Sequence, residues 1–163
     1  VVHHAYVERR VDPLDVVVRR DAPAEARRAV ADFGRSIKDM AATNIFPGDL
    51  LPKNFGLTRN GRVVSYDYDA LGLLTEISFR NLPEATAEDD ASDEVWFGAG
   101  PRDVFPEEFS NFLGLPGDLR RRLEQGHPEL YDLGFWTQMQ DRIRGGEIVD
   151  IFPCDASRRL PRA

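Results

Sequence analysis

Residues 44–69, NIFPGDLLPKNFGLTRNGRVVSYDYD, contain most of the chemistry that this sequence discloses. At their centre an Asn60-Gly61 pair separates two short apolar runs, residues 55–58 and 63–66. Asn-Gly accepts positive φ at both central positions of a tight turn, so the pattern predicts a β-hairpin with a two-residue type I′ turn. The hairpin in turn predicts which residues of the two runs face each other.

The predicted register brings an amide and a carboxylate together. Counting back from the turn, Asn54 faces Asp67, and directly opposed residues of an antiparallel pair lie about 4.5–5.5 Å apart at Cα. Asp69 follows two residues after Asp67, on the same face if the chain remains extended. Asn54, Asp67 and Asp69 therefore form a predicted oxygen-only cluster, which suits a hard cation such as Mg²⁺.

A further acid, Asp49, precedes the hairpin. It begins the string DLLPKN, which has the D-L-x-x-x-N form of the second half of a protein-kinase catalytic loop. In such a loop the Asp positions and deprotonates the attacking hydroxyl, while the Asn and a later Asp hold metal. Phosphoryl transfer needs this spacing because the main task of the protein is to hold nucleophile, metal and phosphate in line. Lys53 is a candidate contact for a phosphate oxygen.

Each of these motifs taken alone is also typical of an ordinary surface turn. A D-L-x-x-x-N string is short, and Asn-Gly hairpins followed by acids are common. Because one hairpin places an Asp, an Asn and a D-x-D pattern together, the combination favours phosphotransfer over the structural alternative.

Composition narrows the class of protein. The chain has 163 residues, 42% hydrophobic and 30% charged, as expected for one globular domain with a real core. Its net charge of −7 and the lack of a basic stripe with interleaved aromatics argue against a nucleic-acid surface. Cys154 is the only cysteine, which excludes an internal disulfide and favours a reducing compartment. No apolar run approaches the roughly 18 residues of a membrane span and no signal peptide is visible, so we expect a cytoplasmic protein without membrane association.

The N-terminal residues raise two further expectations. Residues 2–7 have the pattern of a strand without a lead-in, as if the chain began inside a larger domain. His3 and His4 are adjacent on that predicted strand, so they point to opposite faces and are poorly placed to share a metal ion. Residues 8–13 are predicted as a polar connector closed by a proline, followed by a short apolar run at 14–18.

The rest of the chain is mainly helical in pattern. A helix is predicted from Asp21 to residue 42, with a buried apolar stripe and with Gly34 positioned for a close approach to a neighbour. Its expected role is to hold Asp49 in place. Further helices are predicted at 106–113, 118–125 and 128–144, after a partly extended run at 70–79 and an acidic loop at 80–94. The sequence therefore predicts an α-rich α+β domain.

With these motifs identified, the chain resembles the C-terminal part of the bacterial bifunctional isocitrate dehydrogenase kinase/phosphatase family. The matching segments are YVERR at 6–10, the segment 41–69, LTEISFRNLP at 74–83, DVFPEEF at 103–109, and FW with DRIRGGEIVDIFP at 135–153. They cover almost the whole chain in order. The resemblance implies the large lobe of a protein-kinase-like fold, with a hinge region at 1–20, the helix, catalytic loop and metal-binding hairpin at 21–69, and a helical remainder at 70–163.

The resemblance also implies an activity. The family phosphorylates a serine of isocitrate dehydrogenase and removes that phosphate, which directs carbon between the citric acid cycle and the glyoxylate bypass. It implies ATP and Mg²⁺ as cofactors and isocitrate dehydrogenase as the protein partner, and it leaves open whether the protein forms a homodimer.

Roles for individual residues follow from the same resemblance. It implies Asp49 as catalytic acid or base with Lys53 beside it, and Asn54 and Asp67 as Mg²⁺ ligands. Asp69 becomes a second catalytic acid, important to the phosphatase step. The hinge segment, with Glu8, Arg10 and Val11, would meet the adenine of ATP.

Two features depart from an ordinary protein kinase. Pro47-Gly48 replaces the His-Arg that usually precedes the catalytic Asp, and Asp67-Tyr68-Asp69 replaces D-F-G. A glycine-rich loop and an ATP-binding lysine of a small lobe are absent from the sequence. We therefore expect these 163 residues to hold half of a cleft and to be inactive alone.

Two other functions remain as alternatives. One is a small-molecule phosphotransferase of the aminoglycoside or choline kinase type, which also carries a Gly-Asp-Leu loop and an acidic metal-binding turn. The other is a non-catalytic kinase-like binding module. The strings FRNLP and DVFPEEF favour the kinase/phosphatase, because they resemble that family alone.

Overall fold

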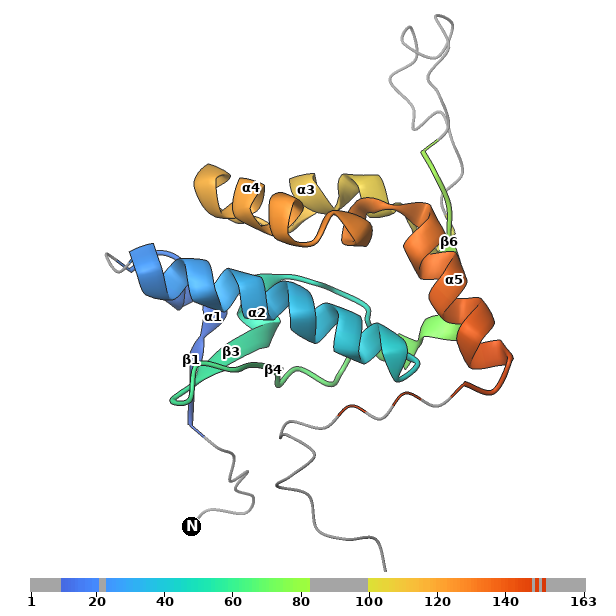
Figure 1. Ribbon diagram of the computed structural model, residues 1–163, viewed down its shortest axis with the longest axis horizontal. Helices are drawn as coiled ribbons and strands as arrows, with labels where there is room; N and C mark the ends of the chain where they lie inside the picture. The colour runs from blue at the N-terminus through green and yellow to red at the C-terminus, as the bar shows by residue number, and fades with distance from the viewer. Residues whose placement is uncertain (1–9, 21–22, 83–99, 148, 150, 152–163) are drawn as a thin grey trace, which may run out of the picture.

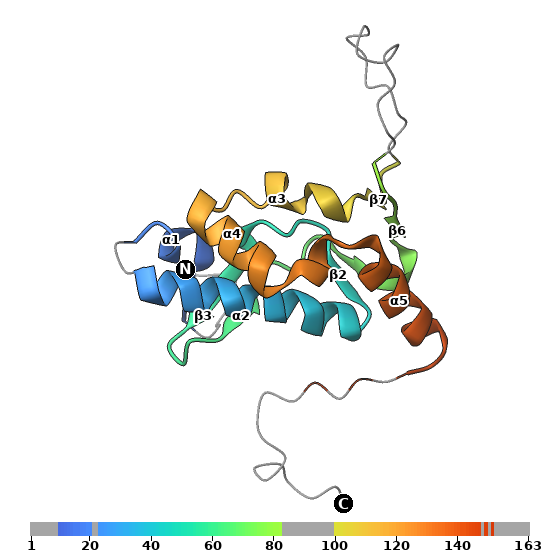
Figure 2. The ribbon, with the colours of Figure 1, turned by 45° about the horizontal axis from the view of Figure 1, so that its top comes forward.

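A computed structural model describes residues 10–20, 23–82, 100–147, 149 and 151, which form a mixed assembly of helices and short strands. A long helix, α2 (Pro23–Ala42), crosses the middle of the molecule. A three-stranded sheet lies against one side of α2 and helix α4 (Gly117–Gly126) lies along the other (Figures 1 and 2). The α+β prediction is therefore confirmed at the level of helices combined with sheets. Among the described residues, no helix is both long enough and apolar enough to cross a membrane.

Helix α2 follows the predicted stripe closely. Its buried residues recur at three- and four-residue steps and are Ala26, Ala29, Val30, Phe33, Gly34, Ile37 and Ala41. Gly34 makes the predicted close approach, since a Cβ there would lie 2.2 Å from Cδ2 of the His127 ring. The predicted cap Asp21 lies outside the described residues.

The segment before α2 differs from the prediction. Val11–Pro13, expected within a polar connector, forms strand β1, and the apolar run after it begins with a short helix, α1 (Leu14–Val17). Strand β1 pairs antiparallel with β3 (Phe55–Thr58), with Val11 opposite Thr58. The connector prediction was wrong because it considered local polarity only, whereas β3 supplies a partner from 45 residues further along.

The predicted hairpin forms between β3 and β4 (Val63–Ser65), but with a different register. Phe55 lies opposite Ser65 and Leu57 opposite Val63, so three residues rather than two form the loop. Of the loop residues only Gly61 has positive φ, at 74°, which is the pattern of a three-residue hairpin and not of a type I′ turn.

Hydrogen bonds across the turn and from helix α2 explain this register. The Thr58 backbone N–H donates to the Arg62 carbonyl at 2.8 Å, and Thr58 Oγ1 accepts the Arg62 N–H at 3.1 Å. Asp32 of α2 accepts hydrogen bonds from Arg62 Nε at 3.1 Å and from the Val63 N–H at 2.7 Å. The helix thus anchors the first residue of β4, and this tertiary contact overrides the local preference of Asn-Gly.

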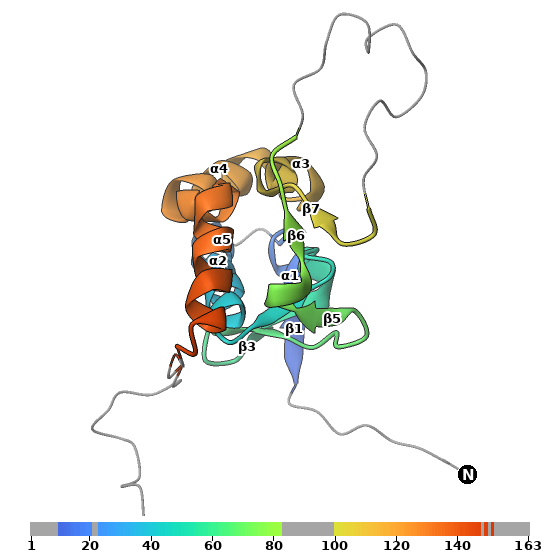
Figure 3. The ribbon, with the colours of Figure 1, turned by 90° about the vertical axis from the view of Figure 1, so that its right-hand side faces the viewer.

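A second small sheet joins β2 (Ile45–Pro47) to β5 (Leu71–Leu73), and β6 (Ser78–Phe79) pairs with β7 (Asp103–Val104) in parallel (Figure 3). The run at 70–79, expected to be extended, is interrupted by the 3₁₀ turn η2 (Leu74–Glu76).

The predicted helices after residue 100 are present with altered starts. The first divides into η4 (Pro106–Glu108) and α3 (Phe109–Phe112), and the second is α4. The third begins as η5 (Pro128–Tyr131) and continues as α5 (Leu133–Arg144), with Asp132 as N-cap accepting the Gly134 N–H at 3.0 Å. The predicted acidic loop lies outside the described residues beyond residue 82.

The core around α5 holds β2 and β6 in place. Trp136 is fully buried, and its ring contacts those of Phe46, Phe79, Phe109 and Phe135 at centroid distances of 5.8, 4.9, 5.7 and 5.2 Å. Gln140 donates from Nε2 to the carbonyls of Leu74 and Ile77, both at 2.8 Å. These contacts fix the sheet from which the predicted catalytic loop departs.

Candidate functional site

Two loops form the candidate site. Each of them connects the sheet of β2 and β5 with the sheet that contains β3 and β4. Residues 48–54 lead from β2 to β3, and residues 66–70 lead from β4 to β5. Because β2 pairs with β5 and β3 pairs with β4, the two loops run side by side in opposite directions. The first carries Asp49, Lys53 and Asn54, and the second carries Asp67 and Asp69.

Backbone hydrogen bonds join the loops at both ends. At one end the Gly48 N–H donates to the Ala70 carbonyl at 2.9 Å. At the other end the Tyr66 N–H donates to the Asn54 carbonyl at 3.2 Å, and the Tyr66 hydroxyl donates to the Lys53 carbonyl. The separation of the loops is therefore fixed by the main chain.

The expected direct opposition of Asn54 and Asp67 was wrong by one residue. Since the hairpin has a three-residue loop, Tyr66 occupies the place opposite Asn54, and Asp67 is the next residue along. Asp67 is half-buried, and its Oδ1 accepts the Asp69 N–H at 3.3 Å. The two acids thus lie in one tight turn, with Asp67 next to the end that pairs with Asn54 and Asp69 next to the end that pairs with Gly48.

The first loop has its own internal contacts. Oδ1 of Asp49 accepts the Leu51 N–H at 2.7 Å, which fixes the carboxylate and leaves Oδ2 without a protein donor among the described residues. Asn54 is only 9% exposed, and its Nδ2 donates to the Asp49 carbonyl at 3.4 Å. That contact directs the amide nitrogen into the loop and makes the amide oxygen the atom that is free for a ligand.

The charges of the site are uncompensated within the described part of the chain. Asp49, Asp67 and Asp69 form no salt bridge there with a lysine or arginine, and Lys53 is exposed without a carboxylate partner. Oxygen donors of this kind fit Mg²⁺, which uses one or two carboxylates together with substrate phosphates and waters. Among the described residues, no group of three or more His, Cys, Asp or Glu side chains is suited to hold a metal ion. A cation at this site would therefore also need the Asn54 amide oxygen and the phosphate oxygens of a bound substrate as ligands.

Tyr66 connects the second loop to its surroundings. Burial of its ring, and the nearby carboxylates of Asp15 and Asp67, raise the pKa of the Tyr66 hydroxyl. The hydroxyl therefore remains protonated and keeps its hydrogen bond to Lys53 at neutral pH. This residue was not singled out from the sequence; its position directly before Asp67 is the signal that could have identified it.

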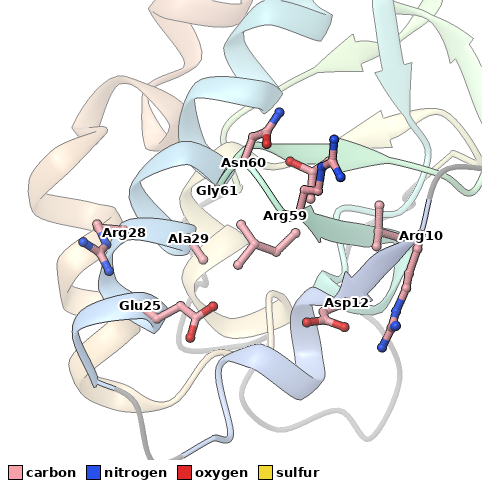
Figure 4. A pocket seen from close by; sticks show the side chains of 11 residues that line it. Arg10, Asp12, Glu25, Arg28, Ala29, Arg59, Asn60 and Gly61 are labelled. Carbon is pink, nitrogen blue, oxygen red and sulfur yellow. The ribbon is translucent and has the colours of Figure 1, made fainter.

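Arg10 and Val11 lie elsewhere, along a pocket of about 820 Å³ between β1, the β3–β4 turn and the first turns of α2 (Figure 4). The carboxylates of Asp12 and Glu25 and the turn residues Asn60 and Gly61 also line it. This pocket shares no lining residue with the two loops. Glu8, the third residue predicted to meet adenine, lies outside the described residues.

A second pocket, of about 410 Å³, reaches the predicted catalytic loop directly. Its lining includes Gly48, Asp49, Leu50 and Leu51 on one side and residues of β7, η4 and α3 on the other. Sequence reasoning missed this pocket, because DVFPEEF was used only as a family motif and as a helix start.

Comparisons with known proteins identify the family of this chain. Residues 1–156 match the family described as Isocitrate dehydrogenase kinase/phosphatase (AceK) kinase domain. The chain is 53% identical over 160 residues to the isocitrate dehydrogenase kinase/phosphatase of Anaeromyxobacter sp. (strain Fw109-5), an alignment covering 98% of this chain and 28% of that protein.

Two further relatives carry the same name. The protein of Methylibium petroleiphilum is 46% identical over 163 residues, covering 99% of this chain and 26% of the relative. That of Xanthomonas axonopodis pv. citri is 49% identical over 156 residues, covering 95% and 27%. The chain thus spans little more than a quarter of the length of these relatives. The family resemblance inferred from the sequence is confirmed, and the chain belongs to the isocitrate dehydrogenase kinase/phosphatase kinase-domain family.

Proposed function

We propose that this chain is the phosphotransfer lobe of an enzyme that phosphorylates a serine of isocitrate dehydrogenase with MgATP and also removes that phosphate. The observation that carries the proposal is the pair of loops joined by Gly48–Ala70 and Asn54–Tyr66, which brings a D-L-x-x-x-N loop beside a D-x-D turn. A catalytic loop followed by a hairpin and an acidic metal turn is the arrangement that a kinase-like large lobe requires. Family membership favours this function over the small-molecule phosphotransferase and the non-catalytic module.

The two loops contribute jointly to the proposed reaction. Oδ2 of Asp49 accepts the proton of the substrate serine, while Oδ1 stays on the Leu51 N–H and holds the carboxylate in one orientation. Asn54 and Asp67 hold Mg²⁺, which when bound with ATP would neutralise charge on the transferring phosphoryl group. Lys53 lies beside Asp49 on the same loop and can contact a phosphate oxygen.

The phosphatase reaction uses the same loops in this proposal. Asp69 is exposed, is connected to Asp67 through its N–H, and forms no salt bridge with the described residues. It is therefore available to orient a water against a phosphoserine. Arg10 and Val11, together with Glu8, are proposed to meet the adenine when the remaining polypeptide completes the cleft.

The whole chain is proposed to act as one lobe, with the hinge at 1–20, the catalytic elements at 21–69 and the helical remainder at 70–163. A cytoplasmic location is part of the same proposal, because a single cysteine, Cys154, leaves no internal disulfide to maintain. The net charge of −7 fits a protein partner better than a nucleic acid.

The test uses the full-length protein, because this chain spans only about a quarter of its relatives. MgATP affinity and phosphate transfer to isocitrate dehydrogenase are measured for wild type, Asp67→Ala and Asp49→Asn. We expect Asp67→Ala to abolish Mg²⁺-dependent nucleotide binding. Asp49→Asn should keep the affinity and lower kcat by roughly 10²–10⁴-fold.

Asp118→Asn is the matched control, an exposed acid in the first turn of α4 that should leave both quantities unchanged. The proposal is wrong if Asp67→Ala binds MgATP as wild type does, or if the full-length wild-type protein shows no Mg²⁺-dependent binding.

A further inference from the structure

The pocket beside Asp49 is bounded mainly by hydrophobic side chains. Its lining is Phe46, Gly48, Asp49, Leu50, Leu51, Asp103, Val104, Phe105, Glu108, Phe109, Phe112 and Leu113. The catalytic loop forms one wall, and the segment that begins with DVFPEEF forms the other. The pocket therefore adjoins the carboxylate proposed to activate the substrate serine.

The floor and one wall of this pocket are held by packing that exists without any ligand. Phe46 and Phe109 each set a ring edge-on against Trp136, at centroid distances of 5.8 and 5.7 Å. The Arg80 guanidinium lies over the Phe105 ring at 5.6 Å and pairs with Asp103 at 3.4 Å. A pocket with such fixed walls can accept an apolar side chain without reorganisation.

The rim of the pocket carries a large apolar side chain, Phe112, that is mostly exposed to solvent. Phe112 is 70% exposed, more than the other large hydrophobic side chains reported as exposed among the described residues. It is the last residue of α3, three residues after the buried Phe109, so its exposure is not the result of an irregular segment. An exposed aromatic ring beside an apolar pocket is typical of a surface that binds another protein.

The charge of the pocket selects its occupant. Three carboxylates, those of Asp49, Asp103 and Glu108, line it, and its lining contains no lysine, arginine or histidine. Asp103 is compensated by Arg80, and Glu108 accepts a hydrogen bond from Asn111 Nδ2 at 2.8 Å, whereas Asp49 has no basic partner in the described part. A segment that carries an acid here would be repelled, and one that carries a basic residue would be favoured.

The pocket is also one end of a longer groove. Leu51 and Leu113 line both this pocket and a smaller hollow of about 210 Å³ that Pro52, Lys53 and Asp15 also line. The two hollows therefore share a boundary at Leu51 and Leu113; Asp49 lines one of them, and Arg19 and Lys53 line the other. This shape fits an extended stretch of polypeptide.

We infer that this groove binds the segment of the protein substrate that carries the phosphorylated serine, with an apolar side chain next to that serine inserted between Phe105, Phe109 and Phe112. The segment carries a basic residue near the same serine, which meets the uncompensated acidic charge. The inference rests on the proposed function, since it assumes that Asp49 receives the serine. It makes Phe112 a residue that determines substrate specificity and takes no part in the chemistry.

The test compares Phe112→Ser, Phe112→Leu and wild type in the full-length protein, with intact isocitrate dehydrogenase as substrate. We expect Phe112→Ser to raise KM for isocitrate dehydrogenase about tenfold or more, the effect of losing an apolar contact in a binding pocket. Phe112→Leu should restore most of the affinity. MgATP affinity should stay unchanged in both variants, because neither touches Asn54 or Asp67.

Leu73→Ser is the matched control, since Leu73 is 49% exposed on β5 and does not line the pocket. On the substrate, the residues flanking the phosphorylated serine are replaced by Ala one at a time. If the pocket binds one of them, its replacement should raise KM strongly in wild type and far less in Phe112→Ser, because the two changes remove the same contact.

Several results would overturn the inference while leaving the proposed function intact. In each case MgATP binding is normal. One such result is that Phe112→Ser has a KM for isocitrate dehydrogenase within twofold of wild type, and another is that Leu73→Ser raises KM as much as Phe112→Ser does. A third is that the substrate has no apolar residue next to the phosphorylated serine. A change from dimer to monomer in sedimentation would assign the groove to a second copy. A large fall in thermal stability would assign it to the remaining polypeptide of the same protein. If the wild-type protein does not bind MgATP, the proposed function and the inference are both wrong.

Discussion

Gly48 donates its backbone N–H to the carbonyl oxygen of Ala70 across 2.9 Å. This bond connects the residue before Asp49 to the residue after Asp69, so it closes the gap between the two loops at the end nearer both acids. The bond from Tyr66 to Asn54 closes the other end. The proposed catalytic side chains thus lie on loops, but each loop end is fixed by main-chain contacts, which gives the site the geometric definition that phosphoryl transfer needs.

The Gly48–Ala70 contact has no room for a side chain. A Cβ at residue 48 would lie 2.7 Å from the Ala70 carbonyl oxygen and 3.3 Å from the Ala70 Cβ. Gly48→Ala is therefore expected to push the loops apart, to lower the free energy of unfolding by about 1–3 kcal/mol and to weaken MgATP binding in the full-length protein. Urea denaturation and nucleotide titration measure the two effects.

Gly126→Ala provides the comparison for that experiment. Gly126 ends α4, and a Cβ there would meet no atom within 4 Å. The change should be neutral or slightly stabilising. Equal behaviour of the two alanine variants would show that the close contact at Gly48 has no role in the site.

Tyr66 offers a second way to loosen the same site. Tyr66→Phe removes the hydroxyl that donates to the Lys53 carbonyl, and we expect a loss of about 1 kcal/mol in the free energy of unfolding and a lower kcat. Tyr68→Phe is the control, since Tyr68 is 64% exposed and its hydroxyl bonds the nearby Ser65 carbonyl at 3.2 Å. A kcat in Tyr66→Phe that matches the control would contradict a role for this bond in ordering the catalytic loop.

The hairpin and its register illustrate what local sequence can and cannot predict. The Asn60-Gly61 pair correctly indicated a hairpin between residues 55–58 and 63–65. The register depends on Asp32, which binds the Val63 N–H from a helix 31 residues earlier. A contact of that kind leaves no periodic signal in the sequence, so the loop was predicted one residue too short.

The candidate site could also be predicted only in part, because its assembly depends on contacts between distant segments. The motifs identified Asp49, Asn54 and Asp67, because phosphotransfer requires those residue types at that spacing. Their juxtaposition depends on the pairing of β2 with β5, two strands of three residues each that show no alternation of polar and apolar side chains and are separated by 23 residues. The pocket beside Asp49 depends on α3 packing against Trp136, which no local pattern indicates.

Gln140 provides a test of how the core supports that pairing. It is 6% exposed, and its Nε2 donates to the carbonyls of Leu74 and Ile77, just after β5. Gln140→Leu leaves the Ile77 carbonyl without its side-chain donor and leaves the Leu74 carbonyl with the Ile77 N–H alone, at 3.1 Å, so the free energy of unfolding should fall by roughly 1–3 kcal/mol. Gln138→Leu on the exposed side of α5 should change it by less than about 0.5 kcal/mol. Similar losses in both variants would attribute the effect to helix propensity and not to the carbonyls.

The ionisation of Tyr131 should make the free energy of unfolding depend on pH above pH 10. Burial, and to a lesser degree the charge of Glu124, raises the pKa of the Tyr131 hydroxyl from 10.0 to about 12. Since the folded state holds this proton more tightly than the unfolded chain, the contribution is complete below pH 10 and is lost as pH rises toward 12. The wild-type protein should therefore lose up to about 1.4 kcal/mol per pH unit in that window from this residue alone.

Tyr131→Phe separates this effect from the titration of other groups. The Tyr131 hydroxyl is buried and has no hydrogen-bond partner in the described structure, so its removal should be neutral or stabilising at pH 7. Above pH 10 the variant should lose stability more slowly than wild type, and the difference between the two should grow with pH. Urea denaturation at pH 7, 9, 10 and 11 measures it. A constant difference across that range would mean that Tyr131 ionises equally easily in the folded and unfolded states, contrary to the burial of its hydroxyl.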